Sequence, residues 1–174
     1  MNDVINNIYT RRSVRAFDEK QIPKEYLDII ADVARYAPSG MNRQEWKFTV
    51  VQNKKLIKKL AKVITEELDR GPDYNFYGAD TLIITAAPRD AKYAVEDCAC
   101  ALQNMFLAAH SLGIGSVWIN QLKGICDVPE VRAVLNEVNM PSDYICNGIA
   151  ALGYAKADNK GKVEKKENVI EYFL

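Results

Sequence analysis

The stretch TLIITAAPRDAKYAVEDCACALQNMFLAAHSLGIGSVWI, residues 81–119, contributes most to the fold. Residues 81–87 are an unbroken apolar run closed by Pro88, and such a run predicts a buried strand. Residues 93–112 are apolar or small around nearly the whole helical circumference, and Gly113 is a suitable C-cap. The stretch therefore predicts a buried strand followed by a helix that lies in the centre of a core.

Helices and strands alternate on both sides of this stretch. Apolar residues at helical spacing predict a short N-terminal helix capped by Asp3, a helix from Pro23, an amphipathic helix over 54–69 and a helix from Pro129. Alternating or continuous apolar runs predict strands over 46–51, 116–120 and 144–154. Several connections are too long or too helical for simple hairpins, so the residues predict a mixed sheet with helices on both faces.

Length and composition indicate one globular domain that spans residues 1–174. The chain has 174 residues, of which 48% are hydrophobic, and this is enough to bury a sizeable core. Its 23 Lys and Arg balance its 23 Asp and Glu, which argues against nucleic-acid binding through bulk charge. No segment approaches the ~20 apolar residues of a membrane span, and the N-terminus lacks a signal-peptide core. We therefore expect a cytoplasmic protein that binds neither nucleic acid nor membrane.

Several common kinds of functional site are excluded because the sequence lacks their motifs. The only histidine, His110, lies on the apolar helix without a GxSxG sequence, so we interpret it as a packed residue rather than a hydrolase base. Gly113 and Gly115 could begin a dinucleotide fingerprint, but Trp118 stands where its third glycine is required. The four cysteines contain no CxxC spacing, so we expect free, mostly buried thiols and no metal site.

Two polar clusters remain as candidates for chemistry. The first contains Arg11, Arg12, Ser13 and Arg15, and guanidinium groups match the oxygens of a phosphate. A solvated basic turn is the alternative for this cluster. The second is the loop 37–46, which has the hydrogen-bonding groups for a flat polar heterocycle but could equally be a turn with local hydrogen bonds.

Four motifs in this order resemble the FMN-dependent nitroreductase family. They are RRSVRAF (11–17), APSGMNRQEW (37–46), EDCACALQNMFLAAHSLGIGSVWI (96–119) and NGIAALGYA (147–155). The resemblance spans nearly the whole chain. It implies an α+β fold, a three-layer α/β/α sandwich with a mixed, largely antiparallel central sheet. It also implies a domain-swapped homodimer with one FMN in each of two sites at the subunit interface.

The resemblance also implies roles for individual residues. Arg11, Arg12 and Ser13 would hold the phosphate and ribityl end of FMN, and Arg15 would lie near the N1/O2 edge of its ring. The residues that would line the ring from the other subunit are Pro38, Ser39, Gly40, Met41 and Asn42, with Gln44 as a further candidate. The backbone at Asn120 and Gln121 would approach flavin N5. The family's C-terminal arginine is absent, and we take Lys162 and Lys165 as its substitutes, with Lys160 also available.

Three departures from the family pattern bear on the site. Asn120 and Gln121 stand where many members have a glycine, and Glu45 stands where many have a proline. The middle of the chain, residues 70–95, is short, so the segment that covers the substrate in longer members is expected to be reduced. These departures concern the space around the flavin ring rather than the cofactor phosphate.

The implied reaction needs no catalytic side chain. NAD(P)H would pass a hydride to FMN, and an electrophilic small molecule such as a nitroaromatic, quinone or enone would be reduced in the same space, in a ping-pong order. Solvent or the ribityl chain could supply the proton. A flavin carrier or redox sensor without rapid turnover is the alternative function, and a stand-alone phosphate module built on Arg11–Arg15 is a third.

The apolar helix and the C-terminal tail predict the dimer. A domain of this size rarely covers such a helix alone, and the tail ends in Val169, Ile170, Tyr172, Phe173 and Leu174 after a polar spacer. We expect a C2 homodimer with residues 155–174 packed on the partner subunit. Its interface should exceed about 2,000 Å², the range of obligate dimers.

Overall fold

The computed structural model describes residues 2–157 and 164–174 of the chain. The helices are α1 (Asp3–Thr10), α2 (Lys24–Asp32), α3 (Lys54–Leu68), α4 (Ala94–Ser111) and α5 (Pro129–Glu137). The strands are β1 (Lys47–Val51), β2 (Thr81–Pro88), β3 (Gly115–Ile119) and β4 (Tyr144–Gly153). Short 3-10 helices, η1 (Val33–Tyr36), η2 (Gly40–Asn42) and η3 (Phe76–Gly78), lie in the connections. All the predicted helices and strands are present, and the helix from Pro23 ends earlier than its apolar pattern because its last turn is η1.

The strands form one antiparallel sheet in the order β1-β2-β4-β3. Its register places Ile84 of β2 beside Ile149 of β4, and Ile149 beside Ile119 of β3. The largely antiparallel character is therefore confirmed. The parallel component is limited, in the part of the chain that the structure describes, to an isolated bridge between Ser13 and Ser116. The N-terminal segment meets β3 there over too few residues to form a strand.

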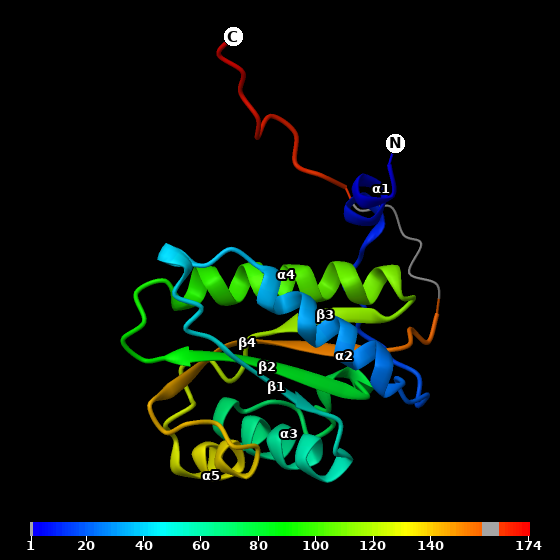
Figure 1. The fold of residues 1–174 in the computed structure, drawn as a ribbon. Helices are drawn as coiled ribbons and strands as arrows, with labels where there is room; N and C mark the ends of the chain where they lie inside the picture. The colour runs from blue at the N-terminus through cyan, green and yellow to red at the C-terminus, as the bar shows by residue number, and fades with distance from the viewer. Residues whose placement is uncertain (1, 158–163) are drawn as a thin grey trace.

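Helices cover both faces of this sheet, with α2 and α4 on one face and α3 and α5 on the other (Figure 1). The alternation of side chains along β2 explains the two layers. Leu82 and Ile84 belong to the core beneath α3 and α5, whereas Ile83 belongs to the core beneath α2 and α4. All three are fully buried. The three-layer sandwich is confirmed.

The central position of α4 follows from its apolar circumference. Leu102 and Met105 are fully buried, and the helix packs on β2, β3 and β4 as well as on α2 and η1. Gly113 adopts φ +72°, a conformation that favours glycine, and its N–H donates to the carbonyl of His110 at 3.1 Å. The C-cap of α4 is Leu112, and Gly113 is the residue that follows it, so the predicted cap is displaced by one residue. Among the described residues, no helix is both long and apolar enough to cross a membrane.

The expectation that Asp3 caps α1 is wrong. The side chain of Asn2 accepts the N–H of Ile5 at 3.0 Å, and Asp3 lies in the first turn of the helix. An amide oxygen one residue earlier satisfies the same free donors, and the carboxylate of Asp3 still complements the positive end of the helix.

Two apolar segments have little cover in one chain. Helix α1 has no buried residue, and its apolar side chains Val4, Ile5, Ile8 and Tyr9 are all exposed. In Figure 1 the segment 164–174 leads away from the sandwich, and its apolar side chains are exposed as well. The sandwich by itself therefore leaves the apolar residues at both ends of the chain in contact with water.

Candidate cofactor site

The basic segment 11–15 runs from the end of α1 to the edge strand β3. Two contacts tie α1 to the C-terminal half of α4: the Asn7 amide donates to the Leu107 carbonyl at 2.9 Å, and Thr10 Oγ1 lies 2.9 Å from His110 Nε2. The N–H of Val14 then donates to the Ser116 carbonyl at 2.9 Å. These bonds fix the backbone on both sides of Arg11, Arg12 and Ser13.

This segment carries positive charge that the described residues do not neutralise. Arg11 is partly buried and has no side-chain hydrogen bond or ion pair with any described residue; burial, and then the neighbouring Arg12, lowers its pKa. Burial, followed by Arg11 and Arg12, also lowers the pKa of His110. Arg12 is oriented differently, because its Nη1 donates to the carbonyls of Tyr9 and Arg11 at 2.6 and 2.8 Å. Arg11 is therefore better suited to bind a phosphate than Arg12, because the Arg12 guanidinium already donates to backbone carbonyls at the end of α1.

A pocket of about 400 Å³ lies at the edge of the sheet beside β3. Arg15, Asn120 and Gln121 all line it, although a hundred residues separate the first from the other two in sequence. The Asn120 N–H donates to Gln121 Oε1 at 3.1 Å, so one of the two backbone donors expected near flavin N5 has an internal partner. The structure thus brings together the residues expected at N1/O2 and at N5.

The same pocket includes residues that the sequence analysis did not select. Arg70, Tyr77, Trp118 and Lys123 line it together with Leu68 and Ile119. Residues 72–80 contain three aromatic side chains, which could have drawn attention to Tyr77. A loop has no periodicity, however, so its sequence does not predict which way these side chains point. Tyr77 has φ +63°, a left-handed conformation that is strained for an aromatic residue. Strain of this kind often marks a functional position.

The second predicted cluster lies elsewhere in the chain. The loop 38–44 precedes β1, the opposite edge of the sheet from β3. Asp97 near the start of α4 accepts the N–H of Gly40 at 2.9 Å, and a Cβ on Gly40 would collide with the ring of Tyr93. Three interstrand spacings, about 14 Å, separate the two edges of the sheet. One chain therefore does not bring this loop to the pocket of Arg15.

The loop 38–44 is held by its own hydrogen bonds in an unusual conformation. Ser39 Oγ accepts the N–H of Gln44 at 3.2 Å, and Gln44 Nε2 donates to Asn42 Oδ1 at 2.9 Å. Met41, Asn42 and Gln44 all have φ near +54°, and the Met41 side chain is 77% exposed. Pro38 is exposed too. The backbone of the loop is therefore strained at three non-glycine residues, whose polar and apolar side chains are exposed.

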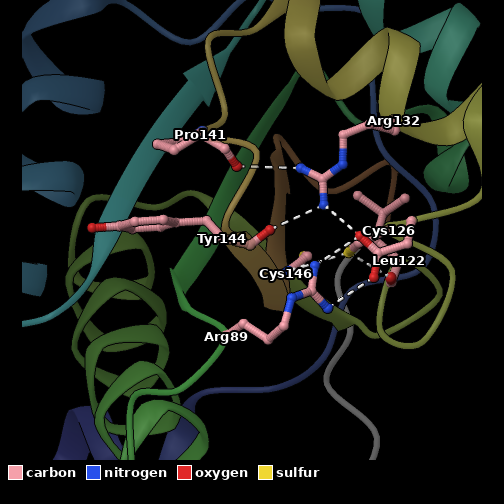
Figure 2. Close-up of polar contacts among 8 residues, drawn as sticks. Arg89, Leu122, Cys126, Arg132, Pro141, Tyr144 and Cys146 are labelled. Carbon is pink, nitrogen blue, oxygen red and sulfur yellow. Dashed lines mark hydrogen bonds and ion pairs between the residues drawn. The ribbon is translucent and has the colours of Figure 1, made fainter.

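The turn that carries Asn120 and Gln121 is anchored by an ion-pair network (Figure 2). Arg89, which follows β2, makes two hydrogen bonds to Asp127 at 2.8 and 2.9 Å. Arg132 of α5 reaches Asp127 at 3.1 Å and the carbonyls of Tyr144 and Pro141 at 3.0 and 3.3 Å. These two guanidinium groups lower the pKa of the Asp127 carboxyl. The network connects β2, the 121–128 turns and the start of β4.

Two buried cysteines complete this anchor. Cys126 Sγ donates to the Leu122 carbonyl at 3.0 Å and accepts the N–H of Cys146 at 3.2 Å (Figure 2). The side-chain hydrogen bond with Cys126, followed by burial, raises the pKa of Cys146. The four cysteines are free thiols, and three of them are buried, as expected.

The predicted C-terminal lysines are placed only in part. Lys160 and Lys162 lie outside the described residues. Lys165 is described and exposed in the tail. No described residue forms an ion pair with Lys165.

Comparisons with known proteins agree with this arrangement. The model of the nitroreductase family matches residues 8–154. A protein of Archaeoglobus fulgidus, named for NADH dehydrogenase and NAD(P)H nitroreductase activity, is 33% identical over 90% of this chain and 87% of its own. An iodotyrosine deiodinase of Thermotoga neapolitana is 29% identical and covers 93% of each chain.

A solved structure extends the likeness to three dimensions. The crystal structure of a nitroreductase with bound FMN from Bacteroides fragilis superimposes with a TM-score of 0.90 at 40% identity, and the match covers 100% of both chains. The family match includes the basic segment, the loop 38–44 and the turn at Asn120, and it ends before the tail that carries Lys165. The chain belongs to the nitroreductase family.

Proposed function

We propose that the protein is an FMN-dependent oxidoreductase that takes electrons from NADH or NADPH and reduces an electrophilic small molecule. The acceptor is a nitroaromatic, a quinone or an enone, and the order is ping-pong. The observation that carries the proposal is that one pocket joins Arg15 to Asn120 and Gln121. The unpaired Arg11 belongs to the same basic segment as Arg15. An oxidoreductase structure with bound FMN superimposes over the whole chain.

The donors present fit FMN along its length. Arg11, with Ser13, would hold the phosphate, because a half-buried cation without a partner suits a dianion. Arg15 would place its positive charge at the pyrimidine edge of the ring, and a cation there raises the reduction potential. The residues 38–44, with Lys162 and Lys165 of the tail, would complete the site from a second chain. Bound FMN supplies the hydride chemistry that no side chain here could perform.

The protein's own residues orient the reaction rather than exchange protons. Among the described residues, the pocket is lined by neither a histidine nor a carboxylate. In this proposal water supplies the proton for the acceptor, and the partly exposed Tyr77 provides a surface against which a conjugated molecule can pack.

The active form is a C2 homodimer in this proposal. The loop 38–44 lies at the far edge of the sheet from Arg15, so both clusters can meet on one ligand only when two chains combine. The exposed apolar face of α1 and the exposed apolar tail give the surface such a dimer would bury. An extensive apolar interface is typical of obligate dimers. Residues 155–174 would then pack on the partner as an extension of a single domain spanning residues 1–174.

Anaerobic flavin reduction tests the proposal. The purified protein should be yellow, and NADH or NADPH should bleach it within seconds, after which an acceptor restores the colour. The acceptor panel contains a nitroaromatic, a quinone, an enone and an iodinated phenol. Yellow protein that neither nicotinamide reduces would support the flavin carrier or sensor instead. Protein that takes up no added FMN would refute both.

A further inference from the structure

Three cations meet around the pocket beside β3, and no acid accompanies them. Arg15, Arg70 and Lys123 line this pocket, and none forms an ion pair with a described residue. No carboxylate belongs to its lining. Positive charges gathered around one cavity of about 400 Å³ repel each other unless an anion enters.

A second pocket of the same molecule shows the ordinary alternative. The larger pocket of about 640 Å³ between α3 and the loop 72–80 also has three cations, Lys54, Lys58 and Lys62. There, however, Asp18, Glu19 and Glu66 share the lining, and Lys62 pairs with Glu66 at 3.8 Å. The surplus of positive charge is therefore specific to the pocket beside β3.

Backbone hydrogen bonds fix where the two additional cations stand. The N–H of Arg70 donates to the Thr65 carbonyl at 3.1 Å, which places Arg70 just past the end of α3. The N–H of Lys123 donates to the Asn120 carbonyl at 3.1 Å, within the turn that carries the residues expected near N5. Both side chains thus start from defined positions on the rim of the pocket.

Two aromatic residues, Trp118 and Tyr77, belong to the lining of the pocket. The rings of Trp118 and Phe106 are 6.1 Å apart, so Phe106 of α4 supports Trp118 from behind. Trp118 is 41% exposed and Tyr77 39% exposed, so both residues have surface that a ligand can cover. Partly exposed aromatic residues together with cations in one lining match a conjugated molecule that carries a negative group.

We infer that Arg70 and Lys123 select an acceptor that carries a carboxylate on an aromatic body. The inference rests on the proposed function, in which Arg15 is already engaged with the cofactor and only Arg70 and Lys123 remain for the acceptor. With a nitroaryl carboxylate, NAD(P)H supplies a hydride, which carries both electrons, and the solvent supplies one proton; one N–O bond breaks and the oxygen leaves as water. The products are the nitroso carboxylate and NAD(P)⁺.

Ligand binding to the FMN-loaded protein tests this without turnover. Benzoate and benzamide have the same shape and differ in charge, and their dissociation constants can be measured by calorimetry and by perturbation of the flavin spectrum. Benzoate should bind about tenfold more tightly than benzamide, as charge-assisted hydrogen bonds are among the stronger polar contacts. R70Q and K123Q should each weaken benzoate about five- to tenfold and leave benzamide unchanged.

A matched variant and a matched substrate pair complete the experiment. K58Q removes a lysine from the other pocket and should change neither ligand. The ratio of kcat/KM for 4-nitrobenzoate over 4-nitrobenzamide should fall in R70Q and K123Q by the same factor as benzoate binding. Equal binding of benzoate and benzamide to the wild-type protein would overturn the inference. It would also be overturned if R70Q or K123Q released FMN but kept the preference for benzoate. Failure to bind FMN at all would instead refute the proposed function.

Discussion

The two edges of the sheet differ in the contacts that one chain provides to the candidate site residues. At the β3 edge, Arg15 and the Asn120–Gln121 turn share a pocket, and the ion pairs of Asp127 hold that turn in place. Before β1, at the other edge, the loop 38–44 bonds mainly to itself and to Asp97, with Met41 exposed to solvent. In the proposed function this contrast has a simple meaning: the β3 edge would receive the cofactor, and the loop before β1 would serve a second chain.

Removal of the tail should have the largest effect. A chain that ends at Ala157 lacks the lysine candidates and five exposed apolar side chains, each contributing about 1.5–3 kcal/mol when fully buried. We expect the dimer dissociation constant to rise more than about 100-fold and FMN to be lost on desalting. Sedimentation velocity measures the first and flavin absorbance the second.

A shorter truncation separates the two causes. A chain that ends at Asn168 keeps Lys165 but lacks the apolar residues, so it should lose the dimer. Full-length Lys165→Gln should remain dimeric. A truncated protein that is still an FMN-loaded dimer would show that the tail is not the anchor.

Gly40→Ala tests the β1 edge from within the loop. Its Cβ would collide with Tyr93, so the loop must move, and we expect the free energy of unfolding to fall by about 1–3 kcal/mol. FMN affinity should fall as well if the loop binds the cofactor. Gly71→Ala is the matched control, because its Cβ meets nothing within 4 Å. Denaturant titration and fluorescence titration with FMN give the two values; identical behaviour of the two variants would contradict the role of this loop.

Arg11→Ala tests the phosphate end of the β3 edge. Loss of a charge-assisted hydrogen bond should weaken FMN binding by about 1.5–3 kcal/mol without unfolding the protein. Arg35→Ala removes an exposed arginine that pairs with Asp32 at 2.8 Å, and it should leave FMN binding unchanged. Unchanged FMN affinity in Arg11→Ala would assign the phosphate to another residue, and loss of the fold would make Arg11 structural.

Arg15→Gln should alter the flavin more than its binding. Without a cation at the pyrimidine edge, the reduction potential should become more negative and hydride transfer slower, while FMN affinity falls less than in Arg11→Ala. Dye-equilibration measurements compare the potentials. Equal potentials in wild type and variant would move Arg15 away from the ring.

His110 should give the smallest effect, through pH. Burial and the two arginines lower its pKa in the folded protein, so the unfolded chain binds the proton more readily. Stability contributed by neutral His110 is then present above its unfolded pKa of about 6.5 and is lost as the pH falls below that value. Denaturant midpoints measured between pH 5 and 7 should therefore depend less on pH in His110→Gln. A steeper dependence of the midpoint on pH in His110→Gln would contradict a lowered pKa of His110 in the folded protein.

Sequence patterns were sufficient to predict the architecture because the buried face of each helix or strand produces a recognisable spacing of hydrophobic residues. The continuous apolar run 81–87 and the apolar circumference of 93–112 each predict one element, and β2 and α4 lie where those patterns place them. Asn2 rather than Asp3 caps α1, since neighbouring polar residues at a helix start are nearly equivalent by sequence. Four ordered motifs were enough to indicate the family, which the family match confirmed.

The tertiary structure alone decided which of the candidate residues meet. Arg15 and Asn120 are joined by the pairing of the N-terminal segment with Ser116, a contact that no local pattern encodes. Arg70, Tyr77 and Lys123 entered the pocket from turns, where side-chain direction depends on backbone conformation and not on periodicity. The sequence by itself thus determined the elements, the core and the basic segment, because hydrophobic spacing and residue chemistry are local. The grouping of unpaired cations, and the separation of the 38–44 loop from them, arose only from the order of strands in the sheet.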